Sequence, residues 1–452
     1  MTTIEYVRQL PSYEIVKFAN PSDGFVRGII NILMPDLLPK IDLYTRGMYS
    51  EARHYDAFRK YERPITTELA IKERLLSDPY IYAARHFVED ELRDSFTVNA
   101  IPMNCLDKVA YVRSSAAGYG YTGLKRDNYL LARAHATSNL ANFVRWGTEF
   151  RFTPYKAFSR TQLALRADPK IRHVWGAPFH TILIEGTIAQ PIIQNLQLND
   201  QPIFVGRDMF KELPSVIHRL MREDHFAYCL DLSSFDSSIN TWFIERFFEF
   251  VRCTVRFRNS FSSKAVAYCQ EELCNTPVVM PDGKLYICKT GIPSGSYFTQ
   301  LIDSYVNLIL LRAAQMCVCS RTLPTYVLGD DSLFVSSDPA LLENYESYFA
   351  LFGFRLNTKK SVVSQDPEKI VFLGHNFYGS RLTRDDFTLA CLAVHTEEPV
   401  LTAHESVTRL CSLLYDSGYN SFFMLNVLKK AVLLYGSPRT MYPPYVSLFL
   451  LG

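Results

Sequence analysis

The stretch "YVLGDDSLFV", residues 326–335, places two adjacent carboxylates, Asp330 and Asp331, behind a glycine and between two short apolar runs. Apolar runs of strand length on both sides of such a turn predict a β-hairpin. Aspartate is also common in ordinary turns, so the Gly-Asp-Asp tripeptide alone is compatible with a purely structural hairpin turn. The neighbouring sequence must decide between a structural turn and a functional acidic site.

A second acidic strand end lies upstream. The run "HFAYCLDL", residues 225–232, has strand length and contains Asp231 near its end, and Asp236 follows at the start of an amphipathic helical pattern. If the strands that hold Asp231 and Asp330 pair, their carboxylates meet at one sheet edge, where repulsion is costly without a cation. Mg²⁺ binds through one or two carboxylates plus substrate phosphates, and two ions about 4 Å apart hold both oxygens of a phosphoryl displacement. The pattern therefore predicts half of a two-metal site.

The composition indicates a large folded protein. The chain has 452 residues, of which 48% are hydrophobic and 13% aromatic, so we expect several subdomains or one large fold rather than a disordered scaffold. Lysine and arginine number 48 against 46 acidic residues, a formal net charge of +2. Overall charge therefore says little about partners, and only local clusters of charge are informative.

Cysteine usage and hydropathy predict a soluble, cytosolic-type protein. The ten cysteines have no framework spacing, which favours reduced thiols. The start "MTTIEYVRQL" carries charged residues where a signal peptide requires an apolar run. No stretch reaches the roughly 20 uninterrupted apolar residues of a membrane span, and the closest, 297–311, contains Gln300, Asp303 and Asn307.

The order of apolar patterns predicts the fold class. From residue 225 to 380 the patterns read strand, helix, helix, strand, strand, helix, strand, which favours an antiparallel sheet backed by helices, an α+β core. The expected helices span 65–78, 126–146, 237–255, 296–317 and 341–352, and the expected hairpins span 325–337 and 371–383, the latter turning near Gly379. The tail from 380 to 452 is expected to be mainly helical.

Polar residues form a stripe on one otherwise apolar helix. Thr299, Asp303 and Asn307 recur every four residues and so share a face. Each costs roughly 1–3 kcal/mol if buried without a partner, although water at a surface would also satisfy them. Just before the helix, Ser294 and Gly295 allow the close backbone approach that a loop around a nucleotide or strand backbone requires.

Two segments have the composition of a nucleic-acid surface. Residues 151–175 contain six lysines or arginines against one acid, Asp168, interleaved with aromatic residues. A basic run is usually a solvated face, but this mixture is the one that phosphate and base contacts require. Upstream, "SSAAGYGYTGLKR", residues 114–126, combines small residues, glycines and tyrosines before two basic residues, which suits a loop along a nucleic-acid backbone.

Taken together, the motifs resemble a known family. "DLSSFD", "GIPSGSYFTQLIDSYVN", "YVLGDD", "RLNTKKS" and "FLGHNFYGS" occur in the order and approximate spacing of the palm motifs of viral RNA-dependent RNA polymerases. The serine-glycine motif and "KIRHVWG" are most similar to those of double-stranded RNA viruses of the partitivirus type. The resemblance covers about residues 114–380 and is specific as a set, although no single tripeptide is.

The resemblance implies a right-hand fold. The expected parts are fingers with an N-terminal extension at 1–220, palm at 221–240, a fingers insertion at 241–285, palm at 286–378 and thumb at 379–452. Asp231 and Asp330, supported by Asp331, would hold two Mg²⁺ or Mn²⁺ ions. Lys360 would protonate the departing pyrophosphate, because a positioned ammonium offsets charge on a leaving group.

The resemblance also assigns binding residues. Those expected to contact the nucleotide are Arg166, Lys170, Arg172, Asp236, Ser294, Gly295, Thr299, Asp303 and Asn307. Those expected to contact RNA are Ser115, Gly118, Tyr119, Lys125 and Gly374.

Asp303 departs from the family pattern, since many relatives have asparagine there. An ionised carboxylate only accepts hydrogen bonds, whereas asparagine also donates. Either Asp236 reads the ribose together with Thr299 or Asn307, or Asp303 is protonated because Asp236 is close. The sequence does not choose between these alternatives.

The expected function is template-directed RNA synthesis with RNA and ribonucleoside triphosphates as partners, without membrane association. The resemblance also points to a viral capsid protein as a partner and to the virus particle in the host cytoplasm as the location. A reverse transcriptase usually has a bulky aromatic residue at the position of Asp236 and tyrosine before its acidic pair, whereas here Leu328 and Gly329 precede it. A non-catalytic RNA-binding or capsid protein would have no reason to keep these residues in polymerase order.

Overall fold

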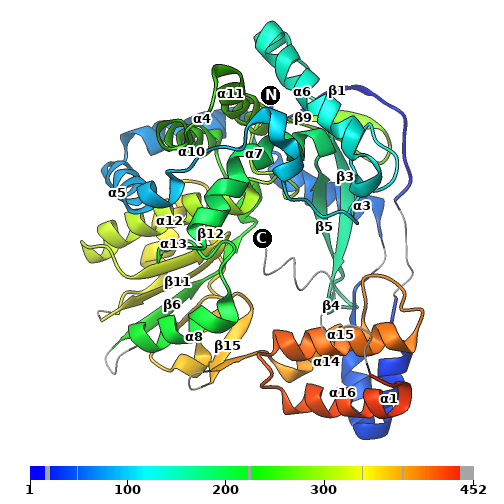
Figure 1. The fold of residues 1–452 in the computed structure, drawn as a ribbon. Coiled ribbons are helices and arrows are strands. Elements are labelled where there is room, and N and C mark those ends of the chain that lie inside the picture. The colour runs from blue at the N-terminus through cyan, green and yellow to red at the C-terminus, as the bar shows by residue number, and fades with distance from the viewer. Residues whose placement is uncertain are drawn as a thin grey trace.

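The computed structural model describes residues 1–15, 21–47, 49–198, 200–221, 225–337, 339–378 and 381–437. The sheet that carries the acidic turn lies on the left of Figure 1, and a second sheet lies at the upper right. A separate group of helices lies at the lower right.

The acidic turn belongs to a four-stranded antiparallel sheet. Its strands lie in the order β10 (Thr325–Leu328), β11 (Asp331–Ser336), β6 (Phe226–Leu230) and β13 (Val362–Ser364). β6 is apolar throughout because both of its faces are covered: Tyr228 packs into the main core, whereas Cys229 packs into a second cluster with α8 (Met209–Leu220). The predicted hairpin at 325–337 is confirmed, and the two acidic strand ends belong to one sheet, with β11 between β10 and β6.

Helix α12 (Thr299–Cys319) packs against β10 and carries the polar stripe. By length and composition alone it is apolar enough to cross a membrane, but 83% of its most apolar window is buried inside the protein. It contacts α5 (Pro79–Phe96), α10 (Thr241–Thr254) and α13 (Leu342–Ala350) as well as the sheet. The apolar composition of this helix therefore corresponds to a central position in the core.

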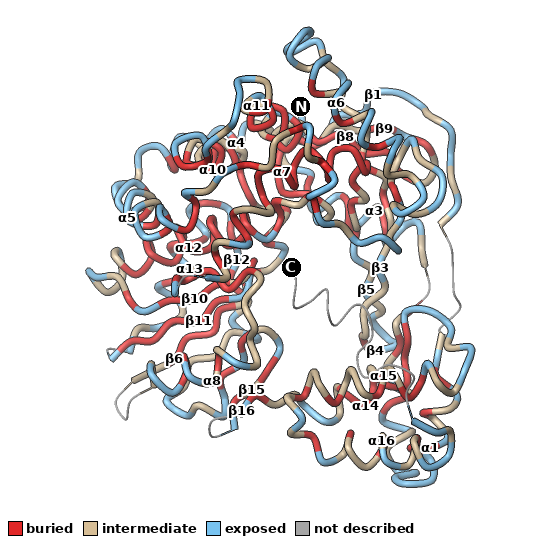
Figure 2. The backbone as a smooth tube through the Cα atoms, in the orientation of Figure 1, coloured by how far each residue is buried: buried red, intermediate tan, exposed pale blue. Residues whose placement is uncertain are grey.

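A five-stranded sheet forms the other side of the molecule. Its order is β1 (Ile4–Gln9), β9 (Lys284–Cys288), β8 (Thr276–Val279), β3 (Tyr155–Gln162) and β5 (Lys170–Gly176). The basic segment of the sequence forms the antiparallel pair β3–β5, which we call the basic hairpin. Its two ends differ: Tyr155 and Trp175 are buried, whereas Lys170 and Arg172 are exposed (Figure 2).

Helix α7 (Phe179–Leu196) follows the basic hairpin and is buried along most of its length. It packs on α6 (Tyr129–Trp146), α11 (Ser260–Cys274) and α5. Further elements are α2 (Leu38–Ile41), α3 (Glu51–Phe58), α4 (Ile65–Ser77), α9 (Phe235–Ser238), β2 (Tyr44–Thr45), β4 (Ala164–Leu165), β7 (Leu232–Ser233) and β12 (Arg355–Leu356).

The C-terminal helices share their core with the N-terminal part of the chain. α14 (Asp386–Val394), α15 (Ala403–Asp416) and α16 (Phe422–Tyr435) pack on α1 (Gly24–Leu33), which Figure 1 shows in blue beside them. The buried Asp23 caps α1 through Val26 N and also accepts hydrogen bonds from Ser406 Oγ (2.8 Å) and Arg409 Nη1 (2.6 Å). We call α14, α15 and α16 the C-terminal helical group.

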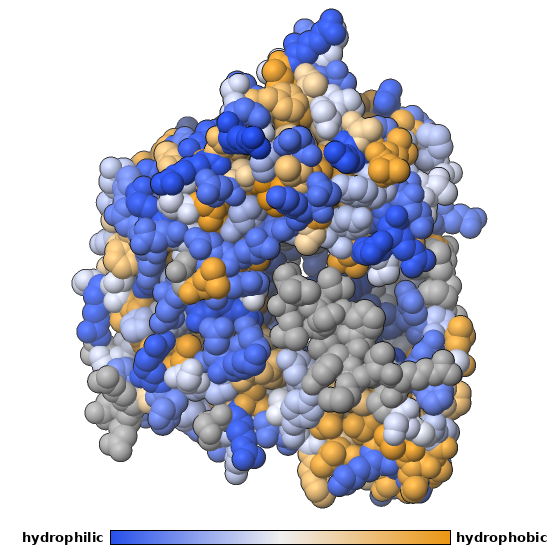
Figure 3. Space-filling view, viewed as in Figure 1, coloured by the Kyte–Doolittle hydropathy of each residue, from blue (hydrophilic) through white to orange (hydrophobic). Residues whose placement is uncertain are grey.

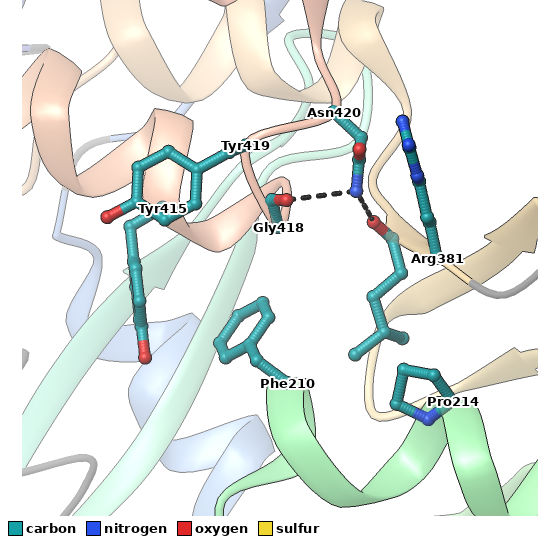
Figure 4. Close-up of a pocket in the computed structure, with 8 residues that line it drawn as sticks. Phe210, Pro214, Arg381, Tyr415, Gly418, Tyr419 and Asn420 are labelled. Atoms are coloured by element: carbon teal, nitrogen blue, oxygen red, sulfur yellow. Dashed lines mark hydrogen bonds between the residues drawn. The ribbon is translucent and has the colours of Figure 1, made fainter.

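Hydrogen bonds fix the junction between the C-terminal helical group and a small three-stranded sheet. Asn420 Nδ2 donates to the carbonyl oxygens of Leu382 (2.7 Å) and Gly418 (2.9 Å), as drawn in Figure 4. In this sheet, β15 (His375–Tyr378) pairs with β14 (Val371–Phe372) on one side and with β16 (Arg381–Thr383) on the other. Leu382 lies in β16. Phe210 of α8 and Tyr415 of α15 line a cavity of about 310 Å³ at this junction.

The predicted domain boundaries remain predictions, but the structure adds one fact about them. Residues 24–41 contribute to the core of the C-terminal helical group, so the segment 1–220 does not form one continuous unit. The predicted turn residue Gly379 and the part of the predicted thumb after residue 437 lie outside the described residues, as do residues 222–224 of the predicted palm. All ten cysteines are free thiols, in agreement with the sequence prediction.

Candidate active site

Three carboxylates meet at one end of the four-stranded sheet, and we call Asp231, Asp330 and Asp331 the acidic edge. Leu230 lies opposite Ser332, so Asp231 and Asp331 continue neighbouring strands past this pair, and Asp330 occupies the β10–β11 turn. Partial loss of hydration beside the surrounding chain and the charges of Asp330 and Asp231 raise the pKa of Asp331 to about 7, although the residue keeps an exposed surface. Burial also raises the pKa of Asp330, with Asp231 adding to the effect and Arg172 and Lys360 opposing it.

Two side chains of helix α12 hold the acidic turn through hydrogen bonds. Ser304 Oγ accepts a hydrogen bond from the Gly329 amide (2.9 Å), and Asn307 Nδ2 donates to the Gly329 carbonyl (2.9 Å). Gly329 has φ +60°, the left-handed conformation that glycine adopts without strain. Asn307 is fully buried, so it supports the turn rather than reaching a nucleotide as the sequence predicted.

Asp236 and Asp303 form a second acidic pair next to the acidic edge. Asp236 lies in the short helix α9, which follows Ser234 in the left-handed region at φ 54°. Burial and the charge of Asp330 raise the pKa of Asp236 to about 6, against the opposing charge of Arg172. Asp303 is 3% exposed, and burial together with Asp236 and Asp330 raises its pKa well above the usual value. Of the two predicted alternatives, these surroundings favour a protonated Asp303.

Hydrogen bonds hold the Ser294–Gly295 loop to two other parts of the chain. Ser294 Oγ accepts from the Trp175 amide (3.2 Å) at the buried end of the basic hairpin, and the Ile292 amide donates to the Asp236 carbonyl (2.9 Å). Thr299 Oγ1 donates to the Pro293 carbonyl (2.8 Å), so it closes the loop at the start of α12. The loop therefore connects β5 to the backbone of Asp236.

Gly295→Ala is expected to destabilise the protein. A Cβ at Gly295 would lie 1.8 Å from the Trp175 carbonyl oxygen, so the loop or β5 has to move. We expect a loss of about 1–3 kcal/mol in the free energy of unfolding, as for other overpacked sites. Gly28→Ala in α1 is the matched control, because nothing lies within 4 Å of its Cβ and alanine favours a helix. Equal denaturant midpoints for Gly295→Ala and the parent chain would contradict this account of the loop.

The predicted basic residues occupy different positions relative to the acidic edge. Arg172 is close enough to influence the pKa of both Asp236 and Asp330, and Lys170 lies two residues before it on β5. Lys360 Nζ is 3.8 Å from Asp231 Oδ1. Arg166 lies at the far end of the basic hairpin, where its Nε donates to the Asp42 carbonyl (2.6 Å), so the structure does not bring it to the acidic edge.

Asp231 is held by the segment that contains Lys360. The Asp231 amide donates to Ser361 Oγ (3.1 Å), and the Asp231 carbonyl accepts from the Asn357 amide (2.8 Å). The side chain of Lys360 remains 66% exposed, so its ammonium is available to a bound ligand.

The residues predicted to contact RNA lie in two loops. The Ser115 carbonyl accepts from the Lys125 amide (2.9 Å), which closes the 114–126 loop, and Tyr119 is half-buried within it. Gly118 packs on the chain, since a Cβ there would lie 2.5 Å from the Ala177 carbonyl oxygen. Gly374, with φ +72°, turns the chain between β14 and β15 and has open space around it. These RNA contacts remain predictions.

Several supporting residues were missed by the sequence prediction. Ser304 and Asn357 hold the acidic edge through backbone hydrogen bonds, for which the sequence offers no distinct signal. Glu185 is fully buried in α7 and bonds to the start of α12. A single carboxylate within the apolar run "TILIEGTI" was a signal that could have identified it.

The carboxylates of the acidic edge suit hard divalent cations whose remaining ligands come from substrate and water. Among the described residues, no group of three or more His, Cys, Asp or Glu side chains is placed to hold a metal ion by itself. Mg²⁺ needs only one or two carboxylates when substrate phosphates and water complete its shell. After the loss of hydration, the charge of Asp231 raises the pKa of Asp330, and the charges of Asp330 and Asp231 raise that of Asp331, a repulsion that such a cation would relieve.

Comparison with known proteins places these features in a family. The family model described as "Viral RNA-dependent RNA polymerase" matches residues 34–415. The chain belongs to this family. Viral RNA-dependent RNA polymerases generally use divalent metal ions, in agreement with the donor set of the acidic edge.

Two curated relatives carry the name RNA-directed RNA polymerase. The protein of Cryptosporidium parvum virus 1 is 26% identical over 312 residues, covering 62% of this chain and 58% of the relative. The protein of White clover cryptic virus 1 is 22% identical over 318 residues, covering 61% of this chain and 51% of the relative. The matches thus span between half and two thirds of the length of these viral polymerases.

The fold agrees with a solved viral polymerase. The insertion-loop deletion mutant of the RNA-dependent RNA polymerase of a human picobirnavirus superposes with a TM-score of 0.64 at 15% identity, covering 91% of this chain and 87% of that one. The predicted right-hand polymerase fold is therefore confirmed.

Proposed function

We propose that the chain is an RNA-directed RNA polymerase of a double-stranded RNA virus, which adds ribonucleoside monophosphates to the 3′ end of an RNA strand on an RNA template. The observation that carries this proposal is the acidic edge, which faces the charge of Arg172 and lies beside the loop anchored on Asp236. The family match over residues 34–415 and the polymerase fold support the same function.

In the proposed site, Asp231 and Asp330 hold two Mg²⁺ or Mn²⁺ ions and Asp331 supports them. Bound cations of this kind lower the pKa of the attacking hydroxyl and neutralise phosphate charge. Asn357, Ser361 and Asn307 keep the acidic edge in place through the hydrogen bonds described above. This preorganisation is what an in-line displacement requires of the protein.

The remaining groups act on the nucleotide. Arg172 and Lys170 bind the triphosphate, and Asp236 accepts a hydrogen bond from the ribose 2′-hydroxyl. The 3′-hydroxyl loses its proton to solvent and its oxygen attacks the α-phosphorus; the bond from that phosphorus to the bridging oxygen breaks, and pyrophosphate leaves. Lys360 Nζ donates a proton to the departing pyrophosphate oxygen, because it is exposed and lies beside Asp231.

RNA template and product are the proposed macromolecular partners. Support comes from the basic hairpin, the 114–126 loop and the hollow that Figure 3 shows near the middle of this face. We further propose a viral capsid protein as a partner and the virus particle in the host cytoplasm as the location, on the strength of the viral relatives.

One assay tests the proposed function. The purified chain is mixed with a primed RNA template, Mg²⁺ and either ribo- or deoxynucleoside triphosphates. We expect extension with ribonucleotides on RNA. Extension with deoxynucleotides instead would indicate a reverse transcriptase, and binding of RNA without extension under any metal would indicate a non-catalytic RNA-binding protein.

Arg172→Ala is expected to raise the KM for nucleotide and to lower kcat/KM, with lysine only a partial replacement for the bidentate guanidinium. Arg160→Ala is the matched control, because Arg160 lies opposite Arg172 on β3 but bonds to Glu397 (2.7 Å). Nucleotide kinetics are measured by single-nucleotide incorporation and template affinity by direct binding. Unchanged nucleotide kinetics with weaker template binding would assign Arg172 to the template strand.

A further inference from the structure

Glu185 of α7 holds the turn that precedes α12. The residue lies in the middle of α7 with no exposed surface. Its Oε1 accepts from Ser296 Oγ (2.6 Å) and its Oε2 accepts from the Tyr297 amide (2.7 Å). Both partners belong to the turn between the Ser294–Gly295 loop and α12, whose own N-cap residue, Phe298, makes no side-chain cap. A carboxylate at this end of a helix is also favoured by the helix dipole.

The next residue of α7 holds the same turn by packing. A Cβ at Gly186 would lie 3.1 Å from Tyr297 Cε2 and 2.3 Å from Val109 Cγ1. Because glycine has no Cβ, α7 approaches Tyr297 more closely than a helix with a side chain at this position could. Glu185 and Gly186 therefore fix the backbone and the ring of Tyr297 together.

Glu185 also links this turn to the 114–126 loop. Burial lowers the pKa of the Lys125 ammonium, and the charge of Glu185 opposes that effect. Lys125 lies at the end of the loop predicted to contact RNA, and its Nζ is 6.0 Å from the centre of the Phe179 ring at the start of α7. One buried carboxylate thus interacts with both the turn before α12 and the 114–126 loop.

We propose that Glu185 is a positioning residue whose carboxylate keeps the Ser294–Gly295 loop in the geometry that accepts the incoming nucleotide. This inference rests on the proposed polymerase function. Glu185 does not touch the substrate in this account, but acts through Ser296 and Tyr297. Removing it would leave a buried hydroxyl and a buried amide without their acceptor, which is costly.

The arrangement makes the loop sensitive to pH. Both hydrogen bonds are accepted by carboxylate oxygens, so protonation of Glu185 places a hydrogen where one of the two donors now points. Burial raises the pKa of Glu185 to about 7, and the hydrogen bonds from Ser296 and Tyr297 and the charge of Lys125 oppose this shift. The other titratable groups around it are Tyr155, Tyr268, Cys269 and Glu272. Both bonds are therefore present above this pKa, and one is lost as the pH falls through it.

The test compares Glu185→Ala and Glu185→Gln with Glu272→Gln as a matched control. Glu272 is an equally buried carboxylate, but it bonds to Thr181 (3.1 Å) and not to the loop. Steady-state incorporation is measured between about pH 6 and pH 8, which brackets the pKa of Glu185. We expect Glu185→Ala to raise the nucleotide KM about tenfold or more, with a smaller change in kcat. Glu185→Gln should remove the contribution of Glu185 to the pH dependence of that KM and leave the contributions of Asp236 and Asp331, whereas Glu272→Gln should keep the wild-type profile.

Amide hydrogen exchange of residues 294–299 provides a readout that does not depend on activity. We expect faster exchange in Glu185→Ala and no change in Glu272→Gln. Wild-type KM and wild-type exchange in Glu185→Ala would overturn the inference. If Glu185→Ala does not fold, a wild-type pH profile in Glu185→Gln would overturn it. A wild-type chain that never extends a primer would instead defeat the proposed function, while the exchange experiment would still judge the role of Glu185.

Discussion

Asp330→Ala is expected to abolish nucleotide addition while leaving RNA binding close to that of the wild-type chain. Asp330 occupies the tight turn at the acidic edge, and its carboxylate is the ligand that a divalent cation would lose. Loss of cation catalysis removes several kcal/mol of transition-state stabilisation, on the order of a thousandfold in rate. Phosphate contacts, by contrast, come mainly from basic residues, so affinity for RNA should persist.

The measurement is primer extension together with RNA binding for Asp330→Ala, Asp330→Asn and Asp231→Ala. The asparagine variant keeps the size of the side chain and removes the charge, so it separates ligation from packing. Glu73→Gln on α4 is the control, an exposed acid on another part of the surface. Extension within about tenfold of wild type in the alanine variants would defeat the assignment of these two carboxylates.

Asp236→Ala is expected to reduce the preference for ribonucleotides. In the proposed site its carboxylate accepts a hydrogen bond from the 2′-hydroxyl, and a site built around such a bond rejects the analogue that lacks the hydroxyl. The variant should lose most of the ribonucleotide rate while the deoxynucleotide rate changes little, since deoxynucleotides never made that bond. The Ile292 amide bonds to the carbonyl of Asp236, so the loop contact does not depend on the side chain.

Asp303→Asn tests the state of the neighbouring carboxyl. Asp303 is buried beside Asp236, and its raised pKa favours the protonated form, which donates a hydrogen bond as asparagine does. We therefore expect this variant to keep most of the wild-type rate. A strong loss would mean that Asp303 carries a required negative charge.

Both variants are compared by single-nucleotide incorporation of matched ribo- and deoxynucleoside triphosphates. The ratio of the two rates is the informative quantity, because it cancels general damage to the enzyme. If Asp236→Ala keeps the wild-type ratio, sugar selection lies elsewhere in the site.

Local patterns predicted the elements around the acidic edge well. The helices expected at 126–146, 296–317 and 341–352 correspond to α6, α12 and α13. Strong apolar periodicity and strand-length runs are the most dependable signals in a sequence. The helix expected at 237–255 begins only at Thr241, because Asn240 caps α10 and a separate short helix precedes it.

Long-range contacts could not be predicted in the same way. Asn307 was expected to face a nucleotide, but its amide lies below the acidic turn and bonds to Gly329. Arg166 belongs to the basic segment, yet the length of the hairpin carries it away to Asp42. The positions of these two side chains depend on the length of the hairpin and on which helix packs against the turn. A local pattern of residues predicts neither.

The shared core of α1 with the C-terminal helical group has a consequence for biosynthesis. Val26, Ile29 and Ile30 of α1 are covered by helices that the ribosome makes only after residues 34–385. The apolar face of α1 must therefore remain uncovered, or be shielded by a chaperone, until residues 386–435 emerge. Premature termination would release a chain in which this face has no partner and Asp23 lacks Ser406 and Arg409. We therefore expect incomplete products to aggregate or to be degraded because α1 is exposed.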